Sequence, residues 1–289
     1  MITHSISLIG KRNANEDQHD IIINIKDDHN NKNILKNMNF LSVYDGHGGK
    51  HVSKFLKYNL SKYFISKGSN FDMSDRPSNI SKYITKVFHH VQNKLEIQCK
   101  NFSEHVGSTA LVLLHFKKDF YIANLGDCRA VLCNKKNCGI SLTKDHKPNS
   151  YEEKIRIENV IKQEKSNVEL EFDGYDWRIE GLSVSRAFGD LDAKPYVTHI
   201  PEVFHRKVSP NDKFIILACD GLWDVISNQD AVDFVLNKIK NINDDNFKTM
   251  TGTSNNNIAK LLAEHAINIG SLDNVSIVIL FLIDKKKIK

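Results

Sequence analysis

Four acidic residues stand at the ends of the most apolar, strand-like segments of the chain. Asp45 follows FLSVY, Asp127 follows YIANLG and Asp220 follows FIILAC, while Asp273 precedes VSIVIL. Each site alone is typical of a turn, because Asp, Asn and Gly readily adopt turn dihedral angles. The segments after Asp45 and Asp220 are helix-like, however, whereas an Asp-Gly hairpin turn leads into a second strand. Because the strand ends of a compact pair of sheets converge in space, the sequence predicts a cluster of carboxylates.

A cluster of carboxylates needs a cation between its members, because buried like charges repel one another. Carboxylate oxygens favour hard ions, so we expect Mg²⁺ or Mn²⁺ rather than Zn²⁺. Gly46, directly after Asp45, lets the backbone turn so that its own carbonyl also faces the ion. The acidic pair Glu16-Asp17 precedes another strand-like segment and is a further candidate. Arg12 lies shortly before it and is suited to bind a phosphate through two parallel hydrogen bonds.

The glycine-rich segment 45–51, DGHGGKH, allows two other interpretations, a surface turn or a phosphate-binding loop. The P-loop requires the spacing GxxxxGK[ST], which this segment lacks, and the sequence also lacks the GxSxG nucleophile elbow. His47 has an unperturbed pKa near neutrality and is suited to protonate a leaving alkoxide. A purely structural role for His47 stays open, because the chain has 13 histidines.

The composition indicates a globular chain of 289 residues, 40% of them hydrophobic and 26% charged, with a formal net charge of +5. Its lysines are scattered, apart from DKKKIK at 284–289, so we expect no nucleic-acid partner. The longest apolar run, VSIVILFLI at 275–283, is too short to cross a bilayer. The N-terminus shows neither a secretory signal nor a myristoylation site, so we expect no membrane partner and a cytoplasmic or nuclear location. The five cysteines form no CxxC pair and are expected to be free thiols.

Apolar periodicity predicts an α+β protein. Strand-like runs follow one another closely between residues 109 and 133, which is typical of antiparallel hairpins. Helical patterns cover residues 49–66, 78–100, 149–161, 228–240 and 257–269. Consecutive strands and paired helices favour layered antiparallel sheets over a parallel βαβ fold. Two asparagine-rich stretches, 27–39 and 241–257, are expected to be polar loop insertions that do not pack, within a single domain spanning 1–289.

Nine short motifs are spread along the chain, from the N-terminal to the C-terminal region, in this order: RNANEDQ, VYDGHGG, GSTALV, ANLGDCRAVL, LTKDHKP, LSVSRAFGD, PEV, ILACDGLWDV and GSLDNVSIVI. In sequence and order they resemble the metal-dependent protein phosphatases, the type 2C Ser/Thr protein phosphatases, from residue 3 to about residue 283. The resemblance implies a four-layer αββα sandwich, in which two antiparallel sheets are flanked by antiparallel helices. It also implies a Mg²⁺- or Mn²⁺-dependent hydrolase that dephosphorylates phosphoserine and phosphothreonine proteins, and we expect a monomer.

The same resemblance implies a binuclear metal centre in a cleft at one end of the sandwich. Asp45 would bridge both ions. Asp220 and Asp273 would hold one of them, while Glu16 and the carbonyl of Gly46 would hold the other. A water that bridges the ions would become hydroxide and attack phosphorus directly, with no phospho-enzyme intermediate.

The remaining roles also come from the resemblance. Asp127 would help to bind a third, weaker ion that some members of the family contain. Arg12 would bind the substrate phosphate, and His47 would be the general acid. Three further carboxylates in matched segments are expected behind the metal ligands: Asp190, Asp192 and Asp224.

The segment of about 148–181 departs from the family pattern and corresponds to the variable flap beside the cleft. It is longer, it lacks a Gly-Gly pair, and Glu180 stands where the family usually has asparagine. The intact ligand positions favour an enzyme over a catalytically inactive scaffold of the same fold, and a metal hydrolase acting on another phosphoester is a third hypothesis. Cys219 adjoins a predicted ligand, so we expect its oxidation to disturb the metal centre.

Overall fold

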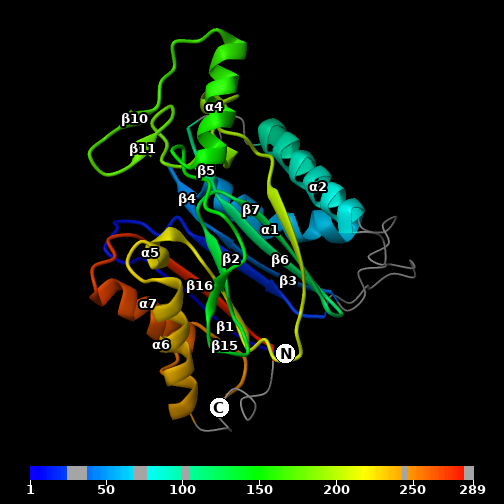
Figure 1. Ribbon diagram of the computed structural model, residues 1–289, viewed down its shortest axis with the longest axis vertical. Coiled ribbons are helices and arrows are strands. Elements are labelled where there is room, and N and C mark those ends of the chain that lie inside the picture. The colour runs from blue at the N-terminus through cyan, green and yellow to red at the C-terminus, as the bar shows by residue number, and fades with distance from the viewer. Residues whose placement is uncertain (25–37, 68–76, 99–104, 243–246, 283–289) are drawn as a thin grey trace.

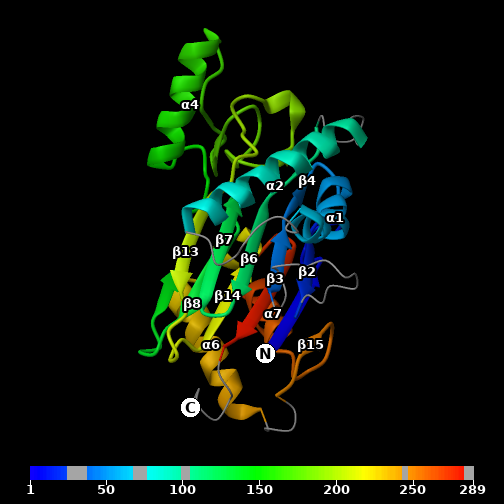
Figure 2. The same ribbon diagram turned by 90° about the vertical axis from the view of Figure 1, so that its right-hand side faces the viewer.

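The structure is a computed structural model that describes residues 1–24, 38–67, 77–98, 105–242 and 247–282. Two large sheets lie face to face at its centre, with helices outside each of them (Figure 1, Figure 2). The first sheet has the strand order β15-β1-β16-β14-β8-β9. These strands are β15 Met250–Thr251, β1 Ile2–Leu8, β16 Val275–Phe281, β14 Phe214–Ala218, β8 Arg129–Cys133 and β9 Gly139–Ser141.

The second sheet has the order β13-β7-β6-β3-β2 and is antiparallel throughout. Its strands are β13 Glu202–Lys207, β7 Asp119–Leu125, β6 Ala110–Phe116, β3 Asn39–Tyr44 and β2 Gln18–Ile22. In the first sheet, the short strand β15 pairs with β1 in parallel and the other pairs are antiparallel. Short strands form a third sheet, ordered β12 Phe188–Gly189, β5 Gly107–Ser108 and β4 Gly46–His47.

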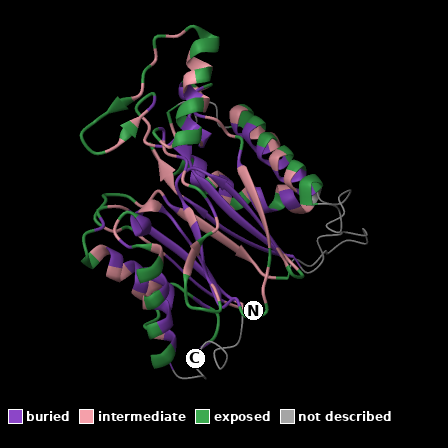
Figure 3. Ribbon diagram, in the orientation of Figure 1, coloured by how far each residue is buried: buried purple, intermediate pink, exposed green. Residues whose placement is uncertain are grey.

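The central strands are apolar on both faces because both faces are covered. In β14, Ile215 and Leu217 pack between the two large sheets. Phe214 and Ile216 of the same strand point the other way, into the layer beneath the helices. A continuous apolar run is therefore what a central strand of this sandwich requires, although antiparallel strands often alternate with polar residues. Figure 3 shows these strands as the buried centre of the molecule.

Helices close both outer faces. α6 Asn228–Asn241 and α7 Ile258–Asn268 cover the first sheet, and α1 His51–Lys67 and α2 Pro77–Gln98 cover the second. In α2 the residues Ile80, Ile84, Val87 and Val91 recur at helical spacing and are all buried. The prediction of a four-layer αββα sandwich is confirmed. Among the helices that the structure describes, none combines the length and the apolar character that crossing a bilayer requires.

The flap contains α4 Tyr151–Glu164, β10 Glu171–Phe172 and β11 Trp177–Arg178, and it projects from the body of the sandwich (Figure 1). Its root has a small apolar cluster of its own, which includes Ile157, Ile179 and Val184. The hairpin β10–β11 is largely exposed (Figure 3).

The two asparagine-rich stretches differ from the prediction where the structure describes them. Residues 25–37 lie outside the described residues, but Met38 is fully buried and Asn39 begins β3. In the second stretch, Phe247 and Met250 are buried, and Met250 pairs with His4. The expectation that this stretch does not pack is wrong, because these isolated apolar side chains suffice to dock it on β1.

Candidate metal centre

A cavity of about 500 Å³ lies where several central strands end. β14 and β16 are antiparallel, so the C-terminal end of one and the N-terminal end of the other meet at the same edge. β3 and β7 run in the same direction on either side of β6, so their C-terminal ends also share an edge. The cavity is lined by the eight residues predicted to bind metal or phosphate or to transfer a proton: Arg12, Glu16, Asp45, Gly46, His47, Asp127, Asp220 and Asp273.

Three carboxylates converge closely in this cavity. Asp45, Asp127 and Asp220 each offer an oxygen, and these oxygens all lie within 4.8 Å of one another. Burial raises the pKa of Asp45 and of Asp220 well above the ordinary value, and repulsion from the neighbouring carboxylates adds to the effect. Such a set of negative charges is stabilised by a divalent cation, and its oxygens are the ligands that Mg²⁺ and Mn²⁺ prefer.

Asp17 is a member of the cluster that the sequence did not resolve. Its side chain is 2% exposed, its Oδ2 atom has no hydrogen-bond partner among the described residues, and burial raises its pKa to about 6. Asp17, Asp45 and Cys219 form a second group whose ligand atoms lie within 4.8 Å of one another. A buried carboxylate oxygen without a donor fits a site that receives a cation or its water ligands.

The backbone of Asp45 is fixed from both sides by one residue. Thr109 donates its N–H to the Asp45 carbonyl at 2.8 Å and accepts the Asp45 N–H on Oγ1 at 3.0 Å. The next residue, Gly46, lies so close to the loop of Glu16 that a Cβ atom there would overlap the Glu16 carbonyl oxygen. Only glycine permits this approach, which brings the two proposed ligand segments together.

Asn274 positions the loop that carries Arg12 and Glu16. It donates from Nδ2 to the carbonyls of Ile9 at 2.8 Å and Ala14 at 2.9 Å, and its Oδ1 accepts the N–H of Glu16 at 2.9 Å. Arg12 itself forms an ion pair with Asp273 at 2.6 Å, and its side chain is 60% exposed. The guanidinium therefore stands at the mouth of the cavity.

Asp220 begins the short helix α5 Asp220–Trp223. A Cβ atom on Gly221 would overlap the carbonyl oxygen of Asn274, so this position requires glycine. Ser271 donates to the Gly221 carbonyl at 2.7 Å. This close contact holds the segments of Asp220 and Asp273 together.

His47 has a buried carboxylate partner. Its Nε2 atom lies 2.8 Å from Oδ2 of Asp190, whose side chain is 2% exposed. Burial alone would lower the pKa of His47, but the hydrogen bond and the charge of Asp190 outweigh it and raise the pKa. Of the other carboxylates expected behind the ligands, Asp192 pairs with His105 at 2.6 Å on the surface. Burial raises the pKa of Asp224.

Comparison with known proteins decides the family. The family model described as Protein phosphatase 2C matches residues 7–275. This chain belongs to the protein phosphatase 2C family. It is 33% identical over 285 residues to the integrin-linked kinase-associated serine/threonine phosphatase 2C of Mus musculus, an alignment that covers 93% of the chain and 69% of the relative. It is 46% identical over 172 residues to a PP2C-like domain-containing protein of Acanthamoeba polyphaga mimivirus, which covers 57% of the chain and 95% of the relative.

Solved structures agree with the protein phosphatase 2C fold. The serine-threonine phosphatase 2C of Toxoplasma gondii aligns with a TM-score of 0.78 and 24% identity, over 96% of this chain and 94% of that one. A C. elegans sex determining protein aligns with a TM-score of 0.83 and 23% identity, over 99% and 66% of the two chains. At these identities the likeness supports the shared architecture alone.

Cys219, which precedes the proposed ligand Asp220, is shielded from solvent. Cys219 is fully buried, and its thiol accepts the Ser276 N–H at 3.1 Å. Burial raises its pKa well above the ordinary value, and the nearby carboxylates of Asp17 and Asp45 add to the shift. Oxidants attack exposed thiolates, so the structure argues against the expected oxidative sensitivity. Every cysteine that the structure describes is a free thiol, as expected: Cys128, Cys133, Cys138 and Cys219.

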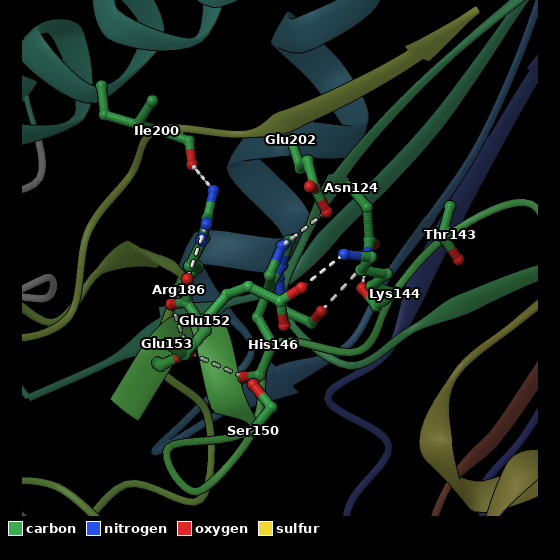
Figure 4. Close-up of polar contacts among 12 residues, drawn as sticks. Asn124, Thr143, Lys144, His146, Ser150, Glu152, Glu153, Arg186, Ile200 and Glu202 are labelled. Atoms are coloured by element: carbon green, nitrogen blue, oxygen red, sulfur yellow. Dashed lines mark hydrogen bonds and ion pairs between the residues drawn. The ribbon is translucent and has the colours of Figure 1, made fainter. Parts of the chain in front are cut away.

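Lys147, which lies in the motif LTKDHKP, forms an ion pair that was not predicted from the sequence. Its ammonium lies 2.5 Å from Oδ2 of Asp127, with 24% of the lysine side chain and 2% of the aspartate side chain exposed. The preceding residue, His146, belongs to the polar network drawn in Figure 4 and faces Glu202 at 3.5 Å. In the same network Glu153 of α4 accepts from Arg186 at 2.6 Å, which anchors the flap helix to the body.

Proposed function

We propose that this chain is a Mg²⁺- or Mn²⁺-dependent Ser/Thr phosphoprotein phosphatase. The observation that supports it best is the convergence of one buried and two partly buried carboxylates, Asp127, Asp45 and Asp220, in one cavity with an arginine at its mouth. Membership of the protein phosphatase 2C family supplies the reaction class, hydrolysis of a phosphoric monoester on a protein. The phosphoserine and phosphothreonine proteins that it would act on follow from that class.

The ligand assignment uses residues that line the cavity. Asp45 would bridge two ions, with Asp220 and Asp273 on one of them and Glu16 and the Gly46 carbonyl on the other. The chemistry of these donors fits hard divalent ions. A bound pair of such ions supplies a nucleophile from water at neutral pH and stabilises the charge of the reacting phosphate.

The residues around the ions would bind the substrate and move its proton. Arg12 is exposed enough to exchange Asp273 for a substrate phosphate, which its guanidinium can bind through two parallel hydrogen bonds. His47 would protonate the leaving serine or threonine oxygen. Because Asp190 engages Nε2 of His47, the nitrogen left for this transfer is Nδ1. Asp127 would help to hold a third ion.

The test is hydrolysis of a phosphothreonine peptide with Mn²⁺, with EDTA, and by the Asp220→Ala variant. We expect turnover that requires the metal and falls by several orders of magnitude in Asp220→Ala. Asp233→Ala, which removes an exposed aspartate on α6, is the matched control and should keep full turnover. If wild type shows no metal-dependent turnover, the inactive scaffold is the better description. Unchanged turnover in Asp220→Ala would refute the ligand assignment.

A second experiment tests the hypothesis that the chain hydrolyses a phosphoester other than a phosphoprotein. Phosphothreonine peptide, a sugar phosphate and a nucleoside monophosphate should be offered at equal concentration under the same metal conditions. The proposed function requires the peptide to have the highest kcat/KM. A preference for either small molecule would move the protein to that third class.

A further inference from the structure

The carboxylate cluster contains a cation that belongs to the protein itself. The Lys147 ammonium forms its 2.5 Å ion pair with Asp127, the carboxylate proposed for the third ion. Oxygens of Asp127, Asp45 and Asp220 lie within 4.8 Å of one another, so Lys147 sits at the edge of the whole cluster. Its charge is attracted by Asp220 as well as by Asp127.

The position of Lys147 is built into the fold rather than left to a flexible side chain. The carbonyl of Lys147 accepts from the N–H of Ser150 at 3.0 Å and from its hydroxyl at 2.9 Å. Just before it, His146 exchanges hydrogen bonds with Gly126, the neighbour of Asp127: the His146 N–H donates to the Gly126 carbonyl at 3.0 Å, and the Gly126 N–H donates to Nδ1 of His146 at 3.2 Å. The loop of Lys147 and the loop of Asp127 are therefore joined by one backbone–backbone hydrogen bond and by one bond to the His146 ring.

A second contact holds the same loop against the body. Ser185 donates its N–H and its hydroxyl to the His146 carbonyl at 2.9 and 3.0 Å. Asn124, at the end of β7, donates to the carbonyls of Gly126 at 3.1 Å and Lys144 at 2.8 Å, as Figure 4 shows for Lys144. The backbone at Lys147 thus keeps its place without help from the lysine side chain. A change of that side chain alters the charge at Asp127 and leaves these hydrogen bonds intact.

We propose that Lys147 is a built-in counter-cation of the metal centre, which occupies the Asp127 carboxylate and competes there with a third divalent ion. The inference rests on the proposed function. An ion that binds Asp127 has to displace the ammonium from Oδ2 or approach it closely, and like charges a few Å apart in a partly buried site repel strongly. The direct ion pair of Lys147 is with Asp127, whereas the first two ions rely on other carboxylates, so the lysine opposes the third ion more strongly than the first two. Lys147 is a positioning and affinity-setting residue, not a catalytic one.

The experiment is a Mn²⁺ titration of the whole chain, followed by the electron paramagnetic resonance signal of free Mn²⁺ and by calorimetry. Lys147→Met keeps an unbranched side chain that is one atom shorter and removes its charge. We expect its third ion to bind at least about tenfold more tightly than in wild type, because one unit of positive charge is gone. Lys147→Arg should keep the third site weak. The matched control is Lys144→Met, since Lys144 lies in the same loop and pairs with Glu152 at 2.6 Å on the surface.

The outcomes separate the two proposals. An unchanged third-site affinity in Lys147→Met, with two ions bound as in wild type, overturns the role of Lys147 and leaves the proposed function standing. If wild type binds no Mn²⁺, the proposed function itself is overturned. Adding Asp127→Asn to Lys147→Met should abolish the tightened site, and its persistence would place that ion elsewhere and contradict the inference.

A measurement on wild type covers the case in which Lys147→Met does not fold. Acetylation of lysines by an activated ester, read by mass spectrometry, reports how freely each amine reacts. We expect the acetylation of Lys147 to rise several-fold as Mg²⁺ fills the third site, with Lys144 as the internal reference. A Lys147 rate that ignores Mg²⁺ over the whole titration refutes the competition.

Discussion

Replacing Asn274 with alanine tests how the site is assembled, because one side chain fixes a whole loop. Its amide binds the carbonyls of Ile9 and Ala14 and the N–H of Glu16. The loop between these contacts carries Arg12, which is largely exposed and pairs only with Asp273 in the part of the chain that the structure describes. Asn274→Ala should therefore loosen the positions of the proposed metal ligand Glu16 and the proposed phosphate-binding residue Arg12, although neither of these residues is itself changed.

The magnitude follows from the hydrogen bonds that are lost. A neutral intramolecular hydrogen bond contributes about 1 kcal/mol to stability, and a buried partner left unpaired costs more. Asn274 is 5% exposed and makes three such bonds, so we expect a loss of about 3 kcal/mol. For a chain of this size that corresponds to a fall in Tm of roughly 5–10 °C. Misplacing binding groups by about 1 Å costs on the order of 100-fold in rate, so kcat/KM should fall by about 10- to 100-fold.

The assay combines thermal unfolding with peptide dephosphorylation at a temperature where the variant is folded. Asn134→Ala is the matched control: Asn134 accepts two backbone N–H groups, at 2.8 and 3.0 Å, in the turn between β8 and β9. It should lower Tm and keep kcat/KM. If Asn274→Ala loses stability but keeps kcat/KM, the loop does not depend on this amide for its position. An unchanged Tm would refute the assignment of its hydrogen bonds.

Three other variants test separate contacts. Asp190→Asn should lower kcat by about 10- to 100-fold with little change in KM, because His47 loses its charged partner; equal kcat would contradict the pairing. Arg186 helps to hold the pKa of Glu153 at about 2, although burial alone would raise it. The ionised carboxylate therefore stabilises the fold fully above pH 4.5, and this stabilisation is lost as the pH falls to about 2. Glu153→Gln should cost about 3 kcal/mol at pH 7 in urea unfolding and lose this acid dependence; a difference from wild type that persists at pH 2 would argue against it. Glu180 has a positive φ of 50° in a two-residue turn, so Glu180→Asn should add about 0.5–1 kcal/mol of stability, and a loss would refute the strain.

The layered fold was predictable because its strands and helices have strong local patterns. The helical periodicity predicted α2 to within two residues at each end, 78–100 against Pro77–Gln98. Strand pairing across the sandwich was not predictable from these patterns. β14 and β16 are apolar on both faces, so the sequence does not show which face meets the helices and which meets the other sheet.

The predicted site residues were found through their position at strand ends, whereas the residues that hold them were not. Asp17 follows Glu16 directly, and neighbouring residues at a strand entry point to different sides, so the sequence cannot say which carboxylate is buried. The structure buries Asp17 and leaves Glu16 in the cavity wall. Lys147 is one of 40 Lys and Arg residues, and in the structure its ion pair with Asp127 and the backbone contact of its neighbour His146 with Gly126 distinguish it.

The pair Asp273-Asn274 shows why the residues that support the site were not predicted from the sequence. The aspartate lines the cavity, and the asparagine turns away from it to bind the loop of Arg12. An asparagine that follows an aspartate is typical of a turn, and nothing in its type indicates three long-range hydrogen bonds. His146-Lys147 divides in the same way, with the histidine bound to the backbone at Gly126 and the lysine directed at Asp127. In both pairs one residue provides charge to the centre and its neighbour provides rigidity. A substitution at the neighbour should therefore change ligand affinity as well as stability, which distinguishes it from an ordinary core substitution.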